Sequence, residues 1–388
     1  MKILNFTLMP YRPMDIPASK QHRSAWVVLP NTFYDPELGA QEYESYIDML
    51  AESEPLGFDG VCVNEHHQTA YGLMPAPNLI ASALIQRTKR IRIAILGRAL
   101  PLVGNPIHIA EEFAMLDNMS RGRIIAGFVR GIGAEYHSTA VNPFYSHERF
   151  HEAHDLIVKA WTTPGPFPWE GEHYNLNYVN LWPRVYQQPH PPVWVPSQGS
   201  IETIEWAADP SRRYPFLVTF SAREAVVRNL TAYRDQCRQF GYEADPGQLG
   251  WAAPVYVAET EERAQNEARV AVEALFNDFL TLPPEMLLPP GYTSAQSLKK
   301  IIATKKAIGR GGFGPGNAPR QTLERLMELG TVLVGTPKTV LAQIEKVREQ
   351  TQLGNFVSML QFGTLNNELT RRNQALFASE VMPHLQAM

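Results

Sequence analysis

The chain has 388 residues, of which 44% are hydrophobic and 19% are charged, and its net charge is −4. This composition supplies a large apolar core, excludes a globally disordered chain and shows no basic bias that would favour a nucleic-acid partner. We expect a cytoplasmic protein, because no run of about 18 apolar residues predicts a membrane span, residues 1–8 are typical of a strand rather than a signal peptide, and two cysteines give no disulfide framework.

Short apolar runs alternate with helical patterns along most of the chain. Strands are predicted at residues 3–9, 58–64, 91–97, 123–129, 192–196, 214–219, 250–257 and 355–362. Helices are predicted at residues 40–53, 77–88, 106–119, 146–161, 200–208, 222–240, 260–280 and from 365 onward. Asn105 and Thr260 are typical helix caps. The strands are continuous apolar runs, as expected when both faces of a strand are covered. Eight successive βα units favour an α/β fold, a single (β/α)8 TIM barrel over residues 1–388, rather than two separate domains.

Three long irregular segments interrupt the alternation, at residues 10–39, 162–190 and 281–320. A typical barrel needs about 250 residues, so these insertions account for much of the additional length. Loops that follow barrel strands lie on the face that carries catalytic residues. We therefore expect the insertions to build a substrate pocket on the C-terminal face, with the glycine-rich residues 309–316 as a candidate lid.

Two short motifs match known patterns in their letters. Residues 309–314 spell G-x-G-x-x-G, but no strand precedes them and a proline follows, so they predict a flexible loop rather than a dinucleotide fingerprint. His147 and His151 are the first and last residues of an H-E-x-x-H pattern on a predicted helix. This is the arrangement of a zinc peptidase. The position six residues beyond His151 is Ile157 rather than a third histidine. A zinc hydrolase is thus a minor alternative, and we expect no metal.

Glu65, His66 and His67 end the second predicted strand, where a barrel places catalytic residues. The pKa of histidine near neutrality suits a general acid or base. A metal centre would need carboxylates or imidazoles at neighbouring strand ends, but the first and third strands end in Met-Pro and Gly-Arg. We expect an acid/base or cofactor-contacting histidine here, with metal-binding and structural roles as alternatives.

Cations and a helix start point to an anionic ligand. Arg98 and Arg130 follow the third and fourth strands, and Ser200 opens the helix after the fifth. Arg149 lies in the first turn of the fourth helix and can reach the same anion. Free backbone N–H groups at a helix start bind phosphate. Each feature alone fits a surface arginine or an ordinary cap equally well, but their convergence on one barrel face favours a phosphate site.

Several stretches resemble the bacterial luciferase-like, flavin-dependent monooxygenase family. The run Asn-Glu-His-His-Gln-Thr-Ala-Tyr-Gly at residues 64–72 is similar to the family's EHH segment. The stretch from residue 105 to 123, followed by Gly-Phe-Val-Arg-Gly at 127–131, is similar to its third helix and the strand after it. Residues 200–208 resemble the fifth βα turn, and Val-Gly-Thr-Pro at 334–337 resembles an element before the last strand. The resemblance spans nearly the whole chain.

The resemblance implies a TIM barrel that binds reduced FMN (FMNH₂) and uses O₂ to form a flavin C4a-peroxide, which oxygenates an organic substrate. It implies that His66 is catalytic, that Glu65 lines the flavin, and that the bond between Leu96 and Gly97 is a cis peptide under the isoalloxazine. The remaining cofactor contacts that it implies are Arg130 at the flavin and Arg149, Gly199, Ser200 and Thr203 at the phosphate turn. In this sequence Gly199 replaces an acidic residue of the family, and Val129 replaces a reactive cysteine, so light emission is not expected.

We therefore predict an FMN-dependent monooxygenase for a small, largely apolar organic substrate, by Baeyer–Villiger oxygenation or hydroxylation. Because the sequence shows no NAD(P)H-binding module, the resemblance implies a two-component enzyme with a separate NAD(P)H:flavin reductase, and it favours a homodimer. The alternatives are a deazaflavin-dependent hydride-transfer oxidoreductase on the same fold, the zinc hydrolase, and a non-catalytic flavin-binding or partner subunit.

Overall fold

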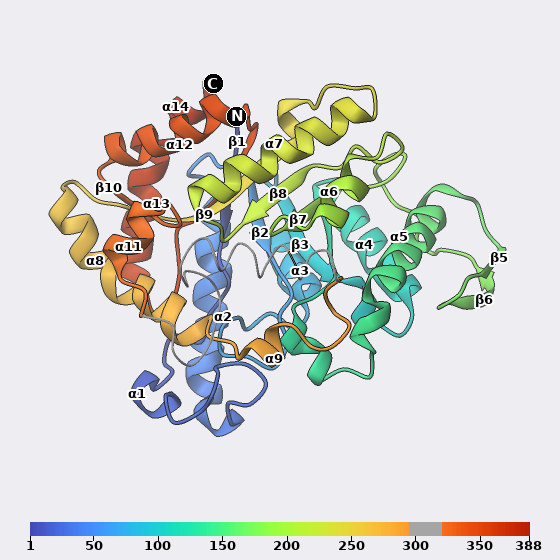
Figure 1. Ribbon diagram of the computed structural model, residues 1–388, viewed down its shortest axis with the longest axis horizontal. Coiled ribbons are helices and arrows are strands. Elements are labelled where there is room, and N and C mark those ends of the chain that lie inside the picture. Colours follow the sequence, from blue (N-terminus) through green and yellow to red (C-terminus); the bar gives the residue numbers. More distant parts are fainter. Residues whose placement is uncertain (295–298, 300–319) are drawn as a thin grey trace.

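The computed structural model describes residues 1–294, 299 and 320–388. In this part of the chain eight parallel strands form a closed barrel (Figure 1). They are β1 (Lys2–Phe6), β2 (Gly60–Val63), β3 (Arg92–Ala99), β4 (Ile124–Val129), β7 (Val193–Ser197), β8 (Phe216–Thr219), β9 (Leu249–Val257) and β11 (Asn355–Met359). The barrel closes because β1 pairs with both β2 and β11, while β9 pairs with both β8 and β11. The eight predicted strands and the TIM-barrel fold are confirmed.

Alternate strand residues belong to two separate apolar clusters. Ile3, Val61 and Ile93 pack outward in the cluster that includes the helix faces. Leu4, Cys62 and Ala94, each the next residue along the same strands, pack in the second cluster, which fills the barrel interior. Successive strand side chains point to opposite faces, so a strand that is buried on both faces must be apolar throughout. This explains why the strands read as continuous apolar runs.

Helices cover the outside of the barrel (Figure 1). They are α2 (Pro36–Ala51), α3 (Pro77–Arg87), α4 (Pro106–Ser120), α5 (Ser146–Thr162), α6 (Ile201–Ala208), α7 (Arg223–Gln239), α8 (Glu261–Ala274), α12 (Pro337–Thr351), α13 (Asn367–Glu380) and α14 (Met382–Gln386). The predicted caps are confirmed: the Asn105 side chain accepts a hydrogen bond from the Ile107 N–H at 3.0 Å, and Thr260 accepts one from the Arg263 N–H at 3.2 Å. None of the helices in residues 1–294 and 320–388 combines the length and hydropathy that a membrane crossing requires.

In two regions the structure differs from the predicted elements. Residues 333–351 form a short strand, β10 (Leu333–Gly335), which pairs in parallel with the end of β9, and then α12; neither element was predicted. The segment 162–190 is not irregular throughout, because it contains the antiparallel hairpin β5 (Phe167–Glu170) and β6 (Asn175–Val179). The Glu152 carboxylate on α5 accepts hydrogen bonds from the backbone N–H groups of His173 and Tyr174 at 2.8 and 3.0 Å, which fixes the turn of this hairpin.

The other insertions lie against the C-terminal ends of the strands. The first carries α1 (Ile16–Ser19) and a 3₁₀ turn, η1 (Asn31–Phe33), and it buries Trp26, whose indole N–H donates to the Phe279 carbonyl at 2.8 Å. The last contains α9 (Pro284–Leu287) and follows a π-helical turn, η6 (Leu275–Phe279), that ends α8. The glycine-rich residues 309–316, the candidate lid and the G-x-G-x-x-G match, lie outside the described residues.

Candidate functional site

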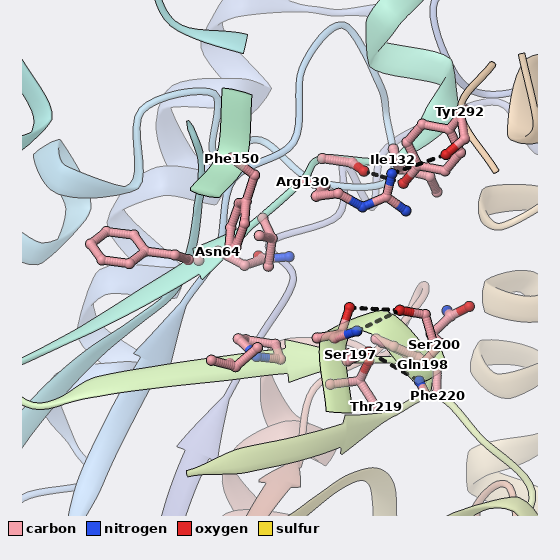
Figure 2. A pocket seen from close by; sticks show the side chains of 18 of the residues that line it. Asn64, Arg130, Ile132, Phe150, Ser197, Gln198, Ser200, Thr219, Phe220 and Tyr292 are labelled. Carbon is pink, nitrogen blue, oxygen red and sulfur yellow. Dashed lines mark hydrogen bonds between the residues drawn. The ribbon is translucent and has the colours of Figure 1, made fainter. Parts of the chain in front are cut away.

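A cavity of about 610 Å³ opens where the barrel strands end (Figure 2). Its walls come from the residues that end or follow β2, β3, β4, β7 and β8, from α5 and α6, and from residues 287–294 of the last insertion. Pockets of roughly 300–1,000 Å³ hold drug-sized ligands and cofactors. The cavity therefore lies on the face where barrel enzymes place their chemistry.

His66 lies in the cavity wall directly after β2. Its Nδ1 is 3.2 Å from Oε1 of Glu135, a carboxylate that is 1% exposed. The rings of Trp26 and Tyr71 both lie with their centres 5.1 Å from the imidazole centre. His66 thus has one buried anionic partner and two aromatic neighbours.

Glu65 and His67 form a separate pair next to His66. Nε2 of His67 lies 2.9 Å from Oε1 of Glu65, and the guanidinium Nε of Arg98 lies 3.0 Å from the other carboxylate oxygen. The hydrogen bond to Glu65 raises the pKa of His67, with burial opposing it. Glu65 lines the cavity, as the resemblance implies, whereas His67 is not among the lining residues. Arg98 is therefore paired with Glu65 and is not among the residues that line the cavity, so it is not placed to bind an anionic ligand there.

Arg130 lines the cavity at the end of β4. Its Nη1 donates to the Ser146 hydroxyl and to the Tyr292 carbonyl, each at 3.0 Å, and its guanidinium lies 4.3 Å from the centre of the Tyr292 ring. Figure 2 shows Arg130 on one side of the cavity and Ser197, Gln198 and Ser200 on the other. The cation thus faces the turn between β7 and α6 across open space.

The turn between β7 and α6 presents small polar groups. Ser200 caps α6, since its hydroxyl accepts a hydrogen bond from the Thr203 N–H at 3.1 Å and lies 2.7 Å from the Thr203 hydroxyl. Gly199 has a φ of +95°, and a Cβ there would lie 2.1 Å from the Asn229 amide. The Asn229 amide donates to the Gln198 carbonyl at 3.2 Å. Arg228 also lines the cavity. Together, the turn and Arg228 offer the hydrogen-bond donors that a phosphate requires.

Arg149 is not brought to the cavity. Its guanidinium donates to the carbonyls of Pro101 and Val103 at 3.3 and 3.2 Å, and it lies 4.9 Å from the centre of the Tyr174 ring. It is not among the residues that line the cavity. Arg149 lies in the first turns of α5 as expected, but its side chain points toward Pro101 and Val103 rather than into the cavity.

His147 and His151 face the cavity from α5 instead. Burial lowers the pKa of each imidazole to about 4, and nearby arginine charges add to the effect. His151 stacks on Trp206 at 5.5 Å between ring centres, and Glu148 of the H-E-x-x-H pattern lies 3.4 Å from His173. Within residues 1–294 and 320–388 no cluster of three or more His, Cys, Asp or Glu side chains is placed to hold a metal ion. Both histidines are therefore neutral polar groups of the wall at pH 7.

Leu96 and Gly97 form the cavity floor within β3. The peptide bond between them is cis, as the resemblance implied. A Cβ on Gly97 would lie 2.6 Å from the Gly127 carbonyl carbon, and a Cβ on Gly127 would lie 2.3 Å from the Ile95 carbonyl oxygen. The two glycines let β3 and β4 approach closely at this point.

Several wall residues are not predicted from the sequence, among them Trp26, Glu135, Arg228 and Tyr292. Glu135 follows Arg130 by five residues, and its acidic type close to a predicted strand end is the only local signal. Trp26 and Tyr292 lie in the insertions, where no periodicity places a side chain. These residues reach the site through tertiary packing.

Comparisons with known proteins give a consistent result. A sequence model described as luciferase-like monooxygenase matches residues 23–352. The chain is 30% identical over 302 residues to an uncharacterized protein of Sinorhizobium fredii, which covers 75% of this chain and 83% of that protein. It is 27% identical over 277 residues to the alkanal monooxygenase beta chain of Photorhabdus luminescens, which covers 69% of this chain and 77% of that protein.

Solved structures share the fold. The oxygenating constituent of 3,6-diketocamphane monooxygenase from Pseudomonas putida, a type II Baeyer–Villiger monooxygenase in complex with FMN, has a TM-score of 0.74 at 20% identity and covers 99% of this chain and 98% of that one. An F420-dependent secondary alcohol dehydrogenase has a TM-score of 0.63 at 14% identity and covers 98% of each chain. At these identities the likeness establishes the fold alone.

Proposed function

The chain belongs to the luciferase-like monooxygenase family, and from this premise we propose that it is an oxidoreductase that uses reduced FMN and O₂ to oxygenate a small, largely apolar organic substrate. One observation carries the proposal: a single cavity is lined both by cationic and hydroxyl groups and by His66 with its aromatic neighbours Trp26 and Tyr71. This combination fits a ligand with an anionic tail and a flat ring.

The donor set fits FMN. Arg130, Arg228 and the Ser200 turn would hold the phosphate, because charged donors and helix-start N–H groups favour an anion there. Leu96, Phe150 and Trp206 would contact the ring system. Asn64 Oδ1 and Trp206 Nε1 are buried wall atoms with no hydrogen-bond partner among the described residues, and a polar ring edge suits such orphaned groups. Bound in reduced form, FMN supplies the two electrons needed to place one oxygen atom of O₂ in the substrate and release the other as water.

The wall beside His66 supports an apolar substrate. Trp26, Tyr71, Leu280 and Leu287 line the cavity with apolar surface, which would help to keep water from a bound substrate. His66 is the titratable group placed to hold or accept a proton there, through the ring nitrogen that does not face Glu135. Hydroxylation and oxygen insertion beside a carbonyl both fit these features.

A separate NAD(P)H:flavin reductase completes the proposal. Reduced FMN must reach the cavity from another protein if this chain does not itself oxidise NAD(P)H. The 3,6-diketocamphane enzyme of the same fold is called an oxygenating constituent, which supports a two-component arrangement. We further propose a homodimer, which light scattering of the purified protein tests.

Anaerobic titration tests the cofactor. We expect reduced FMN to bind more tightly than a deazaflavin of the F420 type, and we expect O₂ to be consumed only when a reductase, NAD(P)H and FMN are all supplied. Tight deazaflavin binding with hydride transfer to a carbonyl compound and no O₂ uptake would instead establish the alternative, which the likeness to the F420-dependent dehydrogenase keeps open. Product mass in ¹⁸O₂ distinguishes oxygenation from simple oxidase activity.

A further inference from the structure

Two consecutive histidines each have their own carboxylate partner. His67 pairs with Glu65, two residues before it, at 2.9 Å. His66 pairs with Glu135 at 3.2 Å, and Glu135 belongs to a different element, the 3₁₀ helix η3 (Gly133–His137) after β4. Only one of the two histidines, His66, is among the residues that line the cavity. The pairing to Glu135 is therefore the one that can affect a bound ligand.

The Glu135 carboxylate is held rigidly. Oε1 accepts a hydrogen bond from the His67 backbone N–H at 3.2 Å in addition to its contact with His66, and Oε2 accepts one from the Ile132 N–H at 2.9 Å. A Cβ on Gly131, whose φ is +81°, would lie 3.1 Å from Oε2. Backbone donors on both oxygens thus fix the orientation of the carboxylate while leaving it able to accept a third hydrogen bond from an imidazole.

We infer that Glu135 is a positioning residue for His66: it keeps the proton of the neutral imidazole on Nδ1 and so presents an unprotonated Nε2 to a ligand in the cavity. The hydrogen bond that one ring nitrogen of a histidine makes determines whether the other nitrogen carries a proton. Among the described residues, Nε2 of His66 has no hydrogen-bond partner. This role rests on the proposed function only for its catalytic use; the tautomer itself is a property of the chain alone.

In this role His66 takes up one proton from a ligand and later returns it. A ligand O–H gives its proton to Nε2, the ring becomes an imidazolium with protons on both nitrogens, and the charge is stabilised by Glu135. The same proton returns to a ligand oxygen in a later step, so no other reagent is consumed. The charged and titratable groups next to His66 are Glu135, in direct contact, Tyr71, whose ring centre lies 5.1 Å from the imidazole centre, and the preceding and following residues Glu65 and His67. Of these, Glu65 is paired with His67 and Arg98, so Glu135 is the anion in direct contact with His66.

NMR of ¹⁵N-histidine-labelled protein without cofactor tests the tautomer, with H66Q used to assign the signal. In the wild-type protein at alkaline pH we expect the shifts of a neutral ring protonated at Nδ1. In E135Q we expect the signals to move toward the tautomer protonated at Nε2, because the carboxylate that accepts the Nδ1 proton is replaced by an amide. The matched control is E152Q, since Glu152 also accepts two backbone N–H groups and a ring N–H but lies outside the cavity. We expect no change of the His66 tautomer in this control.

Turnover supplies a second readout that separates this inference from the proposed function. We expect E135Q to lower kcat about tenfold or more while KM changes little, with partial rescue in E135D. A wild-type ring protonated at Nε2 would overturn the inference, even if E135Q fails to fold, and so would an unchanged His66 tautomer in folded E135Q. The expected NMR result without any FMN-dependent turnover would leave the positioning role intact and overturn the proposed function instead.

Discussion

The guanidinium of Arg130 lies 4.3 Å from the centre of the Tyr292 ring, and the same guanidinium donates to the Tyr292 carbonyl at 3.0 Å. The Tyr292 hydroxyl donates in turn to the Gly131 carbonyl at 2.6 Å. These contacts join the end of β4 to the last insertion. Arg130 also lines the cavity, so a residue proposed to bind the cofactor is oriented by a tyrosine from a segment 162 positions further along the chain.

Replacing Tyr292 therefore tests whether Arg130 needs this support. In Y292L the cation–π contact is lost, and such contacts are worth roughly 0.5–2 kcal/mol. We expect the Kd for FMN to rise about 2- to 30-fold, measured by fluorescence titration. Y292F is the matched control: it keeps the ring and loses only the hydroxyl, so FMN affinity should stay within about threefold of wild type. Equal affinities in Y292L and wild type would show that Arg130 is oriented without the tyrosine.

Gly199 gives a second test at the opposite wall of the cavity. A Cβ there would meet the Asn229 amide at 2.1 Å, and the φ of +95° is unfavourable for any side chain. We expect G199A to lose about 1–3 kcal/mol of unfolding free energy and most of its FMN affinity, because Asn229 must move away from the Gln198 carbonyl. Chemical denaturation and FMN titration measure the two effects.

The control for this variant is G241A. Gly241 has a similar φ of +83°, but a Cβ there would have no atom within 4 Å, and Gly241 lies outside the cavity wall. It should show the backbone penalty alone, about 1–2 kcal/mol, with FMN affinity unchanged. If both variants lost the same stability and G199A still bound FMN normally, the turn would not be part of the cofactor site.

The barrel was predictable because its signals are local. Strands buried on both faces are apolar throughout, and Asn105 and Thr260 mark helix starts by side-chain chemistry alone. The missed helix α12 carries such a signal too, since its buried residues Val340, Ile344 and Val347 fall at helical spacing. The hairpin β5–β6 is harder to read, because its strands are short and half-exposed and depend on Glu152 from α5.

Only the site residues that directly follow barrel strands could be predicted from the sequence. Glu65, His66 and Arg130 line the cavity because the carboxyl ends of parallel strands meet on one face. The direction in which a helical side chain leaves its helix depends on its neighbours, so Arg149 lies outside the cavity while His147 and His151 line it. Glu135 has no spacing relation to His66, and no sequence pattern connects them. Such pairings follow from tertiary packing and become visible only in the folded chain.

The histidines of α5 predict how stability depends on pH. The pKa values of His147 and His151 are lowered to about 4 in the folded chain, against about 6.5 in the unfolded chain. The unfolded chain therefore binds more protons between these values, and the free energy of unfolding should fall as the pH falls from about 6.5 to 4. Denaturant midpoints at pH 7 and pH 5, without cofactor, measure this loss. The double variant H147Q/H151Q should show a smaller loss, whereas H384Q, on α14 and outside the cavity wall, should behave as wild type. A double variant as pH-sensitive as wild type would contradict the assignment.

Replacing Arg149 tests whether its side chain binds phosphate, as the resemblance implies, or supports the fold, as its contacts in the structure indicate. Its guanidinium donates to the carbonyls of Pro101 and Val103 and lies over Tyr174, so it joins α5 to the loop after β3 and to the hairpin segment. In R149A these two carbonyls lose a charged donor, which costs roughly 1–3 kcal/mol, and we expect a lower melting temperature of the cofactor-free protein. The Kd for FMN should stay within about threefold of wild type, while R130A should raise it at least tenfold, because a charge-assisted contact to phosphate is removed. R149K is the control for charge, since lysine cannot span both carbonyls as the planar guanidinium does. A tenfold loss of FMN affinity in R149A with unchanged stability would mean that the guanidinium turns into the cavity when phosphate binds, and the role implied by the resemblance would then hold.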